Sequence, residues 1–305
     1  MSRQPPAQQP PPVQKLWLRY AKRGRGRFAS HRDFARAFER ALRRAGTPMA
    51  YSSGFNPHPR ISWANPAPTG AESESEYVAI GLATVVDPAE LAVALDAALP
   101  PGFALLAAGP AGANLMAELT HSVWEIAFPV WEIAPPARAG ELSVSGAADW
   151  ESLPALSGRG EPRDRAADPE TVAETDRLAP NTTRTDPTNP NTAWADRLAR
   201  DVAWFLAQPA VAVSRQTKDG RRQFDARGPV VSLTLAEPSP DSPQARPGLR
   251  LVTRHTVPLV RPDDVVQALA GADPGLGGDC LMRRTAQGRL LQGRVVDPLP
   301  EPPPA

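Results

Sequence analysis

Arginine side chains gather near the start of the chain, where they could bind the phosphate groups of RNA or of a small molecule. The segment 13–60 contains twelve Lys or Arg residues and two acidic residues, whereas the whole chain of 305 residues has a formal net charge of +1. Such an excess of cations favours an anionic partner, although a solvated helix face that binds nothing is the alternative. The arginines that we expect to contact phosphates are Arg25, Arg27, Arg36 and Arg40.

A stiff turn follows this basic segment, in the stretch YSSGFNPHPRISW. Gly54 permits backbone conformations that other residues avoid, and the prolines fix φ, so we expect a preset loop. The loop could shape ligand specificity beside the arginines, or it could only connect a helix to a strand. Together with His31, the binding residues that we expect there are Tyr51, Ser52, Gly54, Phe55, Asn56, His58 and Arg60.

Acid–base chemistry in this region would have to use Asp33 or His58. The HRD triplet beginning at His31 has the first letters of a kinase catalytic loop, but Phe38 stands where the metal-binding Asn would be. His31 and Asp33 lie two apart on a predicted helix and therefore diverge, so we expect neither a metal nor a cofactor. A second group of candidate residues comes from a later basic segment: Lys218, Arg221, Arg222 and Asp225.

The elements that position the basic segment follow the order strand, helix, strand, strand, helix, strand. Alternating residues in QKLWLRYAK predict a strand, and a helix is expected over 31–45, with Ser30 and Asp33 at its start. Strands are then expected in ISWANPAP, ESEYVAIGL and FALLAAG, with a helix beginning at Pro88 between the last two. This order is that of the ferredoxin-like fold.

The rest of the chain repeats the order more loosely. HSVWEIAFPV predicts a strand and WADRLARDVAWFLAQ a helix, and AVAVSRQ should pair with RRQFDARGPVVSLTL across an Asp-Gly turn. LRLVTRHTV, a helix near 263–270 and RLLQGRVV complete the set. The predicted fold class is α+β, with two ferredoxin-like halves separated by a disordered linker, although the two halves show no clear sequence similarity.

Composition divides the chain into segments that can fold and segments that cannot. Pro accounts for 37 of 305 residues, and it concentrates at both ends and in a Pro, Thr and Asn-rich stretch. These stretches cannot bury enough apolar surface to offset the entropy lost on ordering. We expect a disordered tail over 1–13, the first half over 14–112, the first strand of the second half within 113–134, a disordered linker over 135–193, the remainder of the second half over 194–297, and a disordered tail over 298–305.

The cellular location is expected to be the cytoplasm. The N-terminal stretch lacks the apolar core of a signal peptide, and no apolar run approaches the length of about 20 residues that a membrane span requires. The single cysteine, Cys280, is consistent with a reducing compartment.

Two stretches of the chain resemble a known bacterial family. They are RGRFASHRDFARAFERALRRAGTPMAYSSGFNPHPRISWANPAPTGAESESEY and SRQTKDGRRQFDARG, and they resemble the radical SAM-linked proteins. Members of that family have no settled activity and are encoded beside, or fused to, a radical SAM enzyme. The chain itself lacks the CxxxCxxC cluster that holds the iron–sulfur centre of such an enzyme.

The resemblance implies a non-catalytic accessory protein whose partner is a radical SAM enzyme. It would recognise or present RNA or another anionic substrate through the arginines and the loop. One alternative is an RNA-modifying enzyme, by analogy with the tandem ferredoxin-like halves of pseudouridine synthases. The other alternative is a scaffold for protein interactions.

Overall fold

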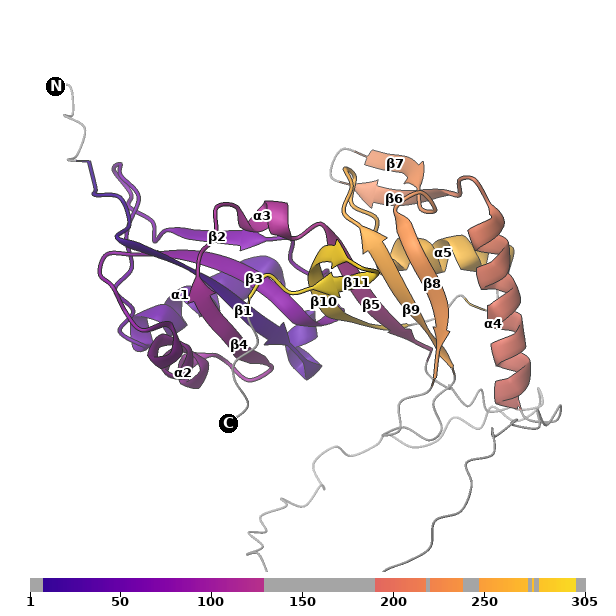
Figure 1. The fold of residues 1–305 in the computed structure, drawn as a ribbon, viewed down its shortest axis with the longest axis horizontal. Coiled ribbons are helices and arrows are strands. Elements are labelled where there is room, and N and C mark those ends of the chain that lie inside the picture. The colour runs from indigo at the N-terminus through magenta and orange to yellow at the C-terminus, as the bar shows by residue number, and fades with distance from the viewer. Residues whose placement is uncertain are drawn as a thin grey trace, which may run out of the picture. The chain divides into compact units, whose positions relative to one another are not determined.

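A nine-stranded sheet forms the frame of the protein in this computed structural model (Figure 1). The structure describes residues 8–128, 190–217, 220–237, 247–273, 276 and 280–299, which lie in one unit of the chain. The strands are β1 (Gln14–Lys22), β2 (Ile61–Ala64), β3 (Glu72–Leu82), β4 (Phe103–Pro110), β5 (His121–Ala127), β6 (Ala212–Thr217), β7 (Gly220–Asp225), β8 (Val230–Ala236), β9 (Gly248–Arg254), β10 (Leu281–Leu291) and β11 (Arg294–Val296). The helices are η1 (Gly24–Phe28), α1 (His31–Arg44), α2 (Pro88–Ala98), α3 (Leu115–Glu118), α4 (Pro190–Ala207) and α5 (Pro262–Ala272).

The predicted α+β class is confirmed, and the sheet is mixed. Its strands follow the order β4-β1-β3-β10-β5-β9-β8, with β2 paired to β3 and β11 paired to β10. Among the described strands, only β3 and β10 run parallel, and they pair at Glu72–Arg283 and Ser73–Arg284. β6 and β7 form a separate two-stranded ribbon, as the predicted hairpin requires.

The two halves of the sheet have the same strand order. In the first half, residues 14–112, the order is β4-β1-β3-β2, with α1 between β1 and β2 and α2 between β3 and β4. In the second half, β10-β5-β9-β8 repeats this order, with α4 and α5 in the corresponding connections. The β6–β7 ribbon is an addition between α4 and β8. The expected repeat of elements therefore extends to the way in which the strands pair.

Several predicted boundaries differ from the structure. RRQFDARGPVVSLTL forms two strands because Asp225 accepts hydrogen bonds from the backbone of Arg227 and Gly228 and closes a turn between β7 and β8. RLLQGRVV contributes to β10 and β11, which are separated by a turn at Gln292 and Gly293 with φ of 49° and 77°.

The predicted linker and tails overlap the described residues only at their edges. α4 begins at Pro190, inside the range expected for the linker, and residues 135–189 of that range lie outside the described residues. Leu299, inside the segment expected to be a disordered tail, is instead buried. At the other end of the chain, the amide of Val13 donates to the carbonyl of Leu82 at 2.8 Å.

Two large apolar cores lie between the sheet and its helices. In the first half, alternate residues of β1, including Leu16 and Leu18, pack with Phe34 and Phe38 of α1. In the second half, alternate residues of β5 and β9 pack with α4 and α5. A smaller cluster around Trp17 packs with α3 on the opposite face of the first half. Among the described residues, no helix combines the length and the apolar composition that crossing a bilayer requires.

Candidate functional site

The predicted arginines lie on and before α1. Ser30 caps this helix, because its hydroxyl accepts a hydrogen bond from the amide of Asp33 at 3.2 Å. With the apolar face of α1 buried against the sheet, its arginines project on the other side. Arg25, Arg36 and Arg40 are exposed and Arg27 is partly buried. Within the described residues, no ion pair involves any of these four arginines. We name them the basic face.

The segment Tyr51–Arg60 forms a small hydrogen-bonded hairpin. The amide of Ser52 donates to the carbonyl of His58 at 2.8 Å, and the amide of His58 donates to the Ser52 hydroxyl at 3.0 Å. Gly54 has φ of 126°, which a residue with a side chain rarely adopts. Phe55 is 60% exposed, and Tyr51, Asn56 and His58 are exposed as well. The hairpin thus presents aromatic and polar side chains at the surface.

The structure spreads the predicted residues along the whole of α1. Arg25 and Arg27 precede its first residue, whereas the hairpin follows its last, so about 20 Å of helix separates the two groups. Arg60 lines a cavity of about 440 Å³ with Trp17 and Met116, on the sheet face opposite α1.

The proposed acid–base residues do not converge. Asp33 is exposed, and its carboxylate accepts a hydrogen bond from the Ser30 hydroxyl at 2.6 Å. His58 is exposed in the hairpin at the other end of α1. His31 packs edge-on against Trp63, with 5.0 Å between ring centroids. Among the described residues, no group of three His, Cys, Asp or Glu side chains could hold a metal ion.

The second group of candidates lies on and beside β7. Lys218 lies outside the described residues, while Arg221 and Arg222 are exposed. Burial acts to raise the pKa of Asp225, but backbone hydrogen bonds from Val211, Arg227 and Gly228 outweigh it and lower the pKa overall. Asp225 therefore stabilises a turn.

A buried polar cluster, which the sequence did not predict, occupies the seam where β3 and β10 pair. Two β-bulges create it. One shifts the register of β3 against β1, so Ser73 and Glu76, three residues apart, face the same side. The other shifts β10 against β5 and does the same for Arg284 and Gln287. Without the extra residues, the strand period of two would send one member of each pair to the opposite face.

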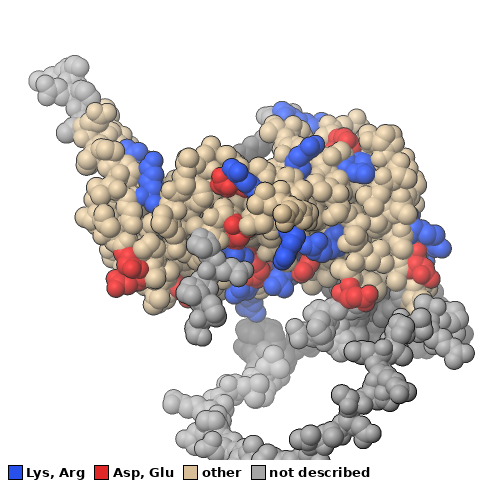
Figure 2. Space-filling view, in the orientation of Figure 1, with Lys and Arg blue, Asp and Glu red and all other residues tan. Residues whose placement is uncertain are grey.

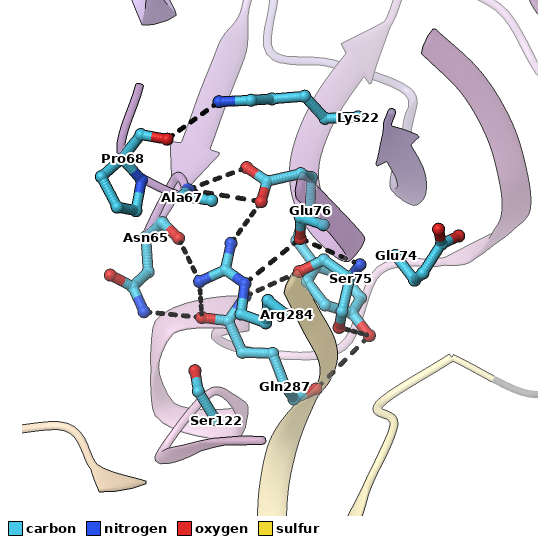
Figure 3. A network of polar contacts seen from close by, with 12 residues as sticks. Lys22, Asn65, Ala67, Pro68, Glu74, Ser75, Glu76, Ser122, Arg284 and Gln287 are labelled. Atoms are coloured by element: carbon cyan, nitrogen blue, oxygen red, sulfur yellow. Dashed lines mark hydrogen bonds and ion pairs between the residues drawn. The ribbon is translucent and has the colours of Figure 1, made fainter. Parts of the chain in front are cut away.

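Arg284 is the centre of this cluster (Figure 3). Its side chain is 1% exposed, and it pairs with the carboxylate of Glu76, itself 2% exposed, at 2.5 Å. The guanidinium also donates to the Asn65 carbonyl at 2.9 Å, to Gln287 at 3.2 Å and to the Ser73 hydroxyl at 3.3 Å. Four of its five N–H groups therefore have acceptors. The seam network comprises Lys22, Asn65, Ser73, Glu76, Arg284 and Gln287.

The seam network holds two buried cations and one buried carboxylate. The ammonium of Lys22 donates to the carbonyl of Pro68 at 3.1 Å, and Lys22 is buried. Burial lowers the pKa of Lys22; the carboxylate of Glu76 acts to raise it and the guanidinium of Arg284 to lower it. With Lys22 and Arg284 protonated and Glu76 ionised, the three side chains carry a net charge of +1. Buried charge that is not balanced is costly, and it often marks a functional site.

A cavity of about 240 Å³, here called the seam cavity, lies beside the network. His255 lies at its wall, where Nδ1 contacts the Leu119 carbonyl oxygen at 2.6 Å and Nε2 contacts the Ser122 hydroxyl at 2.8 Å. Burial lowers the pKa of His255 to about 4, and the charge of Arg284 lowers it as well. The cavity is lined by Asn65, Pro66, Pro68, Ser122, Trp124, Thr253, His255, Leu259, Val260, Arg261 and Arg284.

The pattern of apolar and polar residues in the sequence contains a signal for this site. In each of three strands, a row of alternate residues on the helix-covered face is apolar except at the end of the row near the seam. The residue at that end is polar. The row Leu16, Leu18 and Tyr20 of β1 is followed by a buried lysine. The polar residues at the seam ends of the three rows are Lys22, which follows its row in β1, Ser122, which precedes its row in β5, and Thr253, which follows its row in β9. Buried polar residues at the ends of apolar rows indicate a shared polar site.

Fold and site together define an α+β protein with two like-ordered half-sheets, an arginine-rich surface and a charged seam between the halves. The chain belongs to a bacterial family described as "Uncharacterized protein conserved in bacteria (DUF2344)", whose model matches residues 15–262. The match includes the basic face, the hairpin and the strands β5 to β9. A search of curated proteins found no match. The expected bacterial family of uncharacterized proteins is thereby confirmed, while the link to a radical SAM enzyme stays a prediction.

Proposed function

We propose that the protein binds RNA through the basic face, as the accessory protein of a radical SAM enzyme. The observation that carries this proposal is the set of arginines on and before α1 that have no ion pair within the described residues. Guanidinium groups bind phosphate oxygens in pairs of hydrogen bonds, and several along one helix can follow a phosphate backbone. The side of the molecule drawn in Figure 2 differs from the basic face, because several of its Lys and Arg side chains lie beside Asp or Glu.

Exposed aromatic rings at both ends of the basic face favour a single-stranded nucleic acid. Phe28 is 60% exposed, and the guanidinium of Arg27 lies 4.6 Å from its ring centroid. Phe55 in the hairpin is also 60% exposed. Bases stack on such rings with little regard to sequence, while arginines hold the phosphates between them.

The strand order supports a ferredoxin-like description of both halves. The order 4-1-3-2, all antiparallel, with helices between the first and second and between the third and fourth strands, is the arrangement of that fold. The fold hosts many functions, so the RNA proposal rests on the basic face and not on the fold. Within the described residues, Asp33 and His58 line none of the three cavities found and lie at opposite ends of α1, so the alternative of an RNA-modifying enzyme that uses this pair has no support from their placement.

A salt titration tests the RNA proposal. Binding of a short fluorescent single-stranded RNA would be measured by anisotropy between about 50 and 300 mM salt. Replacing Arg36 and Arg40 by Gln should reduce the slope of log affinity against log salt by about 0.7 per lost contact, as for single strands. Gln retains helix propensity, so the free energy of unfolding should change by less than about 1 kcal/mol.

The matched control removes two exposed arginines from another surface. Arg250→Gln/Arg254→Gln on β9 loses the same charge and should leave the slope unchanged. Equal effects of the two double variants would show a general charge effect and no specific surface. If the wild-type protein shows no salt-dependent binding of RNA, the nucleic-acid proposal is wrong.

The accessory role is tested by co-purification. Tagged protein should recover a radical SAM enzyme when the two are co-expressed from the same bacterium, and the complex should persist in the Arg36→Gln/Arg40→Gln variant if partner and RNA use different surfaces. Failure to recover any radical SAM enzyme would remove that part of the proposal and leave the RNA assay untouched.

A further inference from the structure

The seam cavity gathers polar side chains from segments that are distant in the sequence. Asn65 comes from the loop after β2, Ser122 from β5, Thr253 from β9, Arg261 from the residue before α5, and Arg284 from β10. Its volume of about 240 Å³ corresponds to roughly eight water molecules at about 30 Å³ each. A ligand with up to about eight non-hydrogen atoms would therefore fill it.

The charge around the seam cavity is positive. Among the described residues, its lining includes Arg261 and Arg284 and neither Asp nor Glu. Glu76 lies behind Arg284, and Lys22 adds a second buried cation to the same network. Near Arg261, the carboxylate of Asp264 is bound to Arg215 at 2.7 Å, and the carboxylate of Asp263 interacts with the charges of both Arg261 and Arg215. The four cations Lys22, Arg215, Arg261 and Arg284 therefore face three carboxylates. The groups that face the cavity thus favour an anion.

The wall of the cavity is held in place before any ligand arrives. Asn65 has φ of 43°, a left-handed conformation that costs energy and tends to occur at functional sites. The conformation directs its amide to Gln287 at 2.6 Å, while its carbonyl accepts from Arg284. Such preorganisation reduces the entropy that a ligand must lose on binding.

The pair formed by Ser122 and His255 has the contacts of a nucleophile and its base, but its electrostatics favour binding over catalysis. Nε2 of His255 accepts from the Ser122 hydroxyl, while Nδ1 donates to the Leu119 carbonyl. A pKa of about 4, set by burial and by Arg284, makes the imidazolium unfavourable. His255 would therefore hold a proton from Ser122 poorly, because an effective base has a pKa near the working pH.

We propose that the seam cavity binds a small anion of the carboxylate or phosphate class at the junction of the two halves, held by Arg261 and attracted by the buried charge of Arg284. The exposed side chain of Arg261 contacts the anion, while Arg284, which is 1% exposed and donates most of its N–H groups to protein acceptors, contributes its positive charge from the buried side. This site is independent of the basic face, because it uses none of the arginines of α1.

Isothermal titration calorimetry with inorganic phosphate and with succinate tests the proposal, at an ionic strength held constant with chloride. At least one of the two anions should bind saturably at a single site. Arg261→Gln should weaken this binding about tenfold, the effect of losing one charge-assisted hydrogen bond. Because Arg261 is exposed, the variant should fold normally. Arg36→Gln/Arg40→Gln should bind the anion like the wild type.

A second readout locates the anion. The imidazole NMR signal that is missing in His255→Gln should shift in the wild type when the anion is added, with the same midpoint as the calorimetric titration. Binding of neither anion, an affinity within twofold of wild type in Arg261→Gln, or an unmoved His255 signal would each overturn the proposal. A negative RNA titration would not affect it.

Discussion

Removing the negative charge from the seam network should destabilise the protein more than any comparable change at its surface. In Glu76→Gln the side chain keeps its size, but Arg284 and Lys22 remain buried with no opposite charge beside them. Glu76 also accepts hydrogen bonds from the amide of Ala67 at 3.1 and 3.3 Å, which the Gln carbonyl can retain only in part. Breaking one partner of a buried ion pair typically costs 3 to 5 kcal/mol, so we expect about 3 kcal/mol or more.

Glu74→Gln provides a matched control on the same strand. Glu74 also pairs with an arginine, Arg23, at 2.5 Å, but that arginine is 51% exposed and water can replace the carboxylate. Exposed pairs contribute about 0 to 1 kcal/mol, so the control should lose no more than about 1 kcal/mol. Both variants would be measured by urea unfolding with linear extrapolation, followed by tryptophan fluorescence.

A double-mutant cycle separates the ion pair from the rest of the network. If Glu76 and Arg284 stabilise each other, the cost of Glu76→Gln/Arg284→Gln should fall short of the sum of the single variants by at least about 1 kcal/mol. Additive costs, or a loss in Glu76→Gln no larger than that in Glu74→Gln, would refute the argument that the charges at the seam depend on one another.

Two further predictions concern acid and the linker. The pKa of His255 is about 4 in the folded protein and ordinarily near 6.5. As the pH falls, the unfolded chain therefore takes up this proton at a higher pH than the folded protein does. The stability that a neutral His255 provides is therefore complete above pH 6.5 and is lost as the pH falls towards 4, by at most about 3 kcal/mol. In urea unfolding, the free energy of unfolding of His255→Gln should depend less on pH over this range than that of the wild type. Parallel plots of this free energy against pH would contradict the assignment. Replacing residues 135–189 by a Gly/Ser linker long enough to join β5 to α4 should leave the melting transition nearly unchanged, because the composition of these residues offers little apolar surface for a core. Loss of cooperative unfolding in this variant would show that the segment packs against the rest of the protein.

Local signals in the sequence predicted most individual elements. The helix expected to begin at Pro88 does begin there, and the carboxylate of Asp87 caps it by accepting hydrogen bonds from the amides of Ala89 and Glu90 at 2.7 and 3.1 Å. The cap at Ser30 and the β6–β7 hairpin follow the same pattern. These features depend on residues that are a few positions apart, so the sequence alone contains the information needed to place them.

Long-range features could not be predicted in the same way. Glu76 and Arg284 are 208 residues apart, and their contact requires the parallel pairing of β3 with β10 and a bulge in each strand. A bulge changes which residues share a face, yet it leaves no periodic mark in a short strand. The strand expected in RLLQGRVV begins at Arg289 and so omits Arg284 and Gln287, and the alternation in ESEYVAIGL gives no sign that Ser73 and Glu76 share a face.

The polar seam is best understood by comparison with an apolar one. β3 and β10 pair at only two positions, so side chains must supply much of the junction between the halves. Apolar residues of equal volume could do this with equal or greater stability, because burying an ion pair costs about as much as it returns. A purely structural junction would need neither the second cation, Lys22, nor the cavity beside Arg284. An anion in that cavity would balance the excess charge, and it would stabilise the two halves in their joined state by mass action. Binding of the anion and the docking of the two halves would then be thermodynamically coupled.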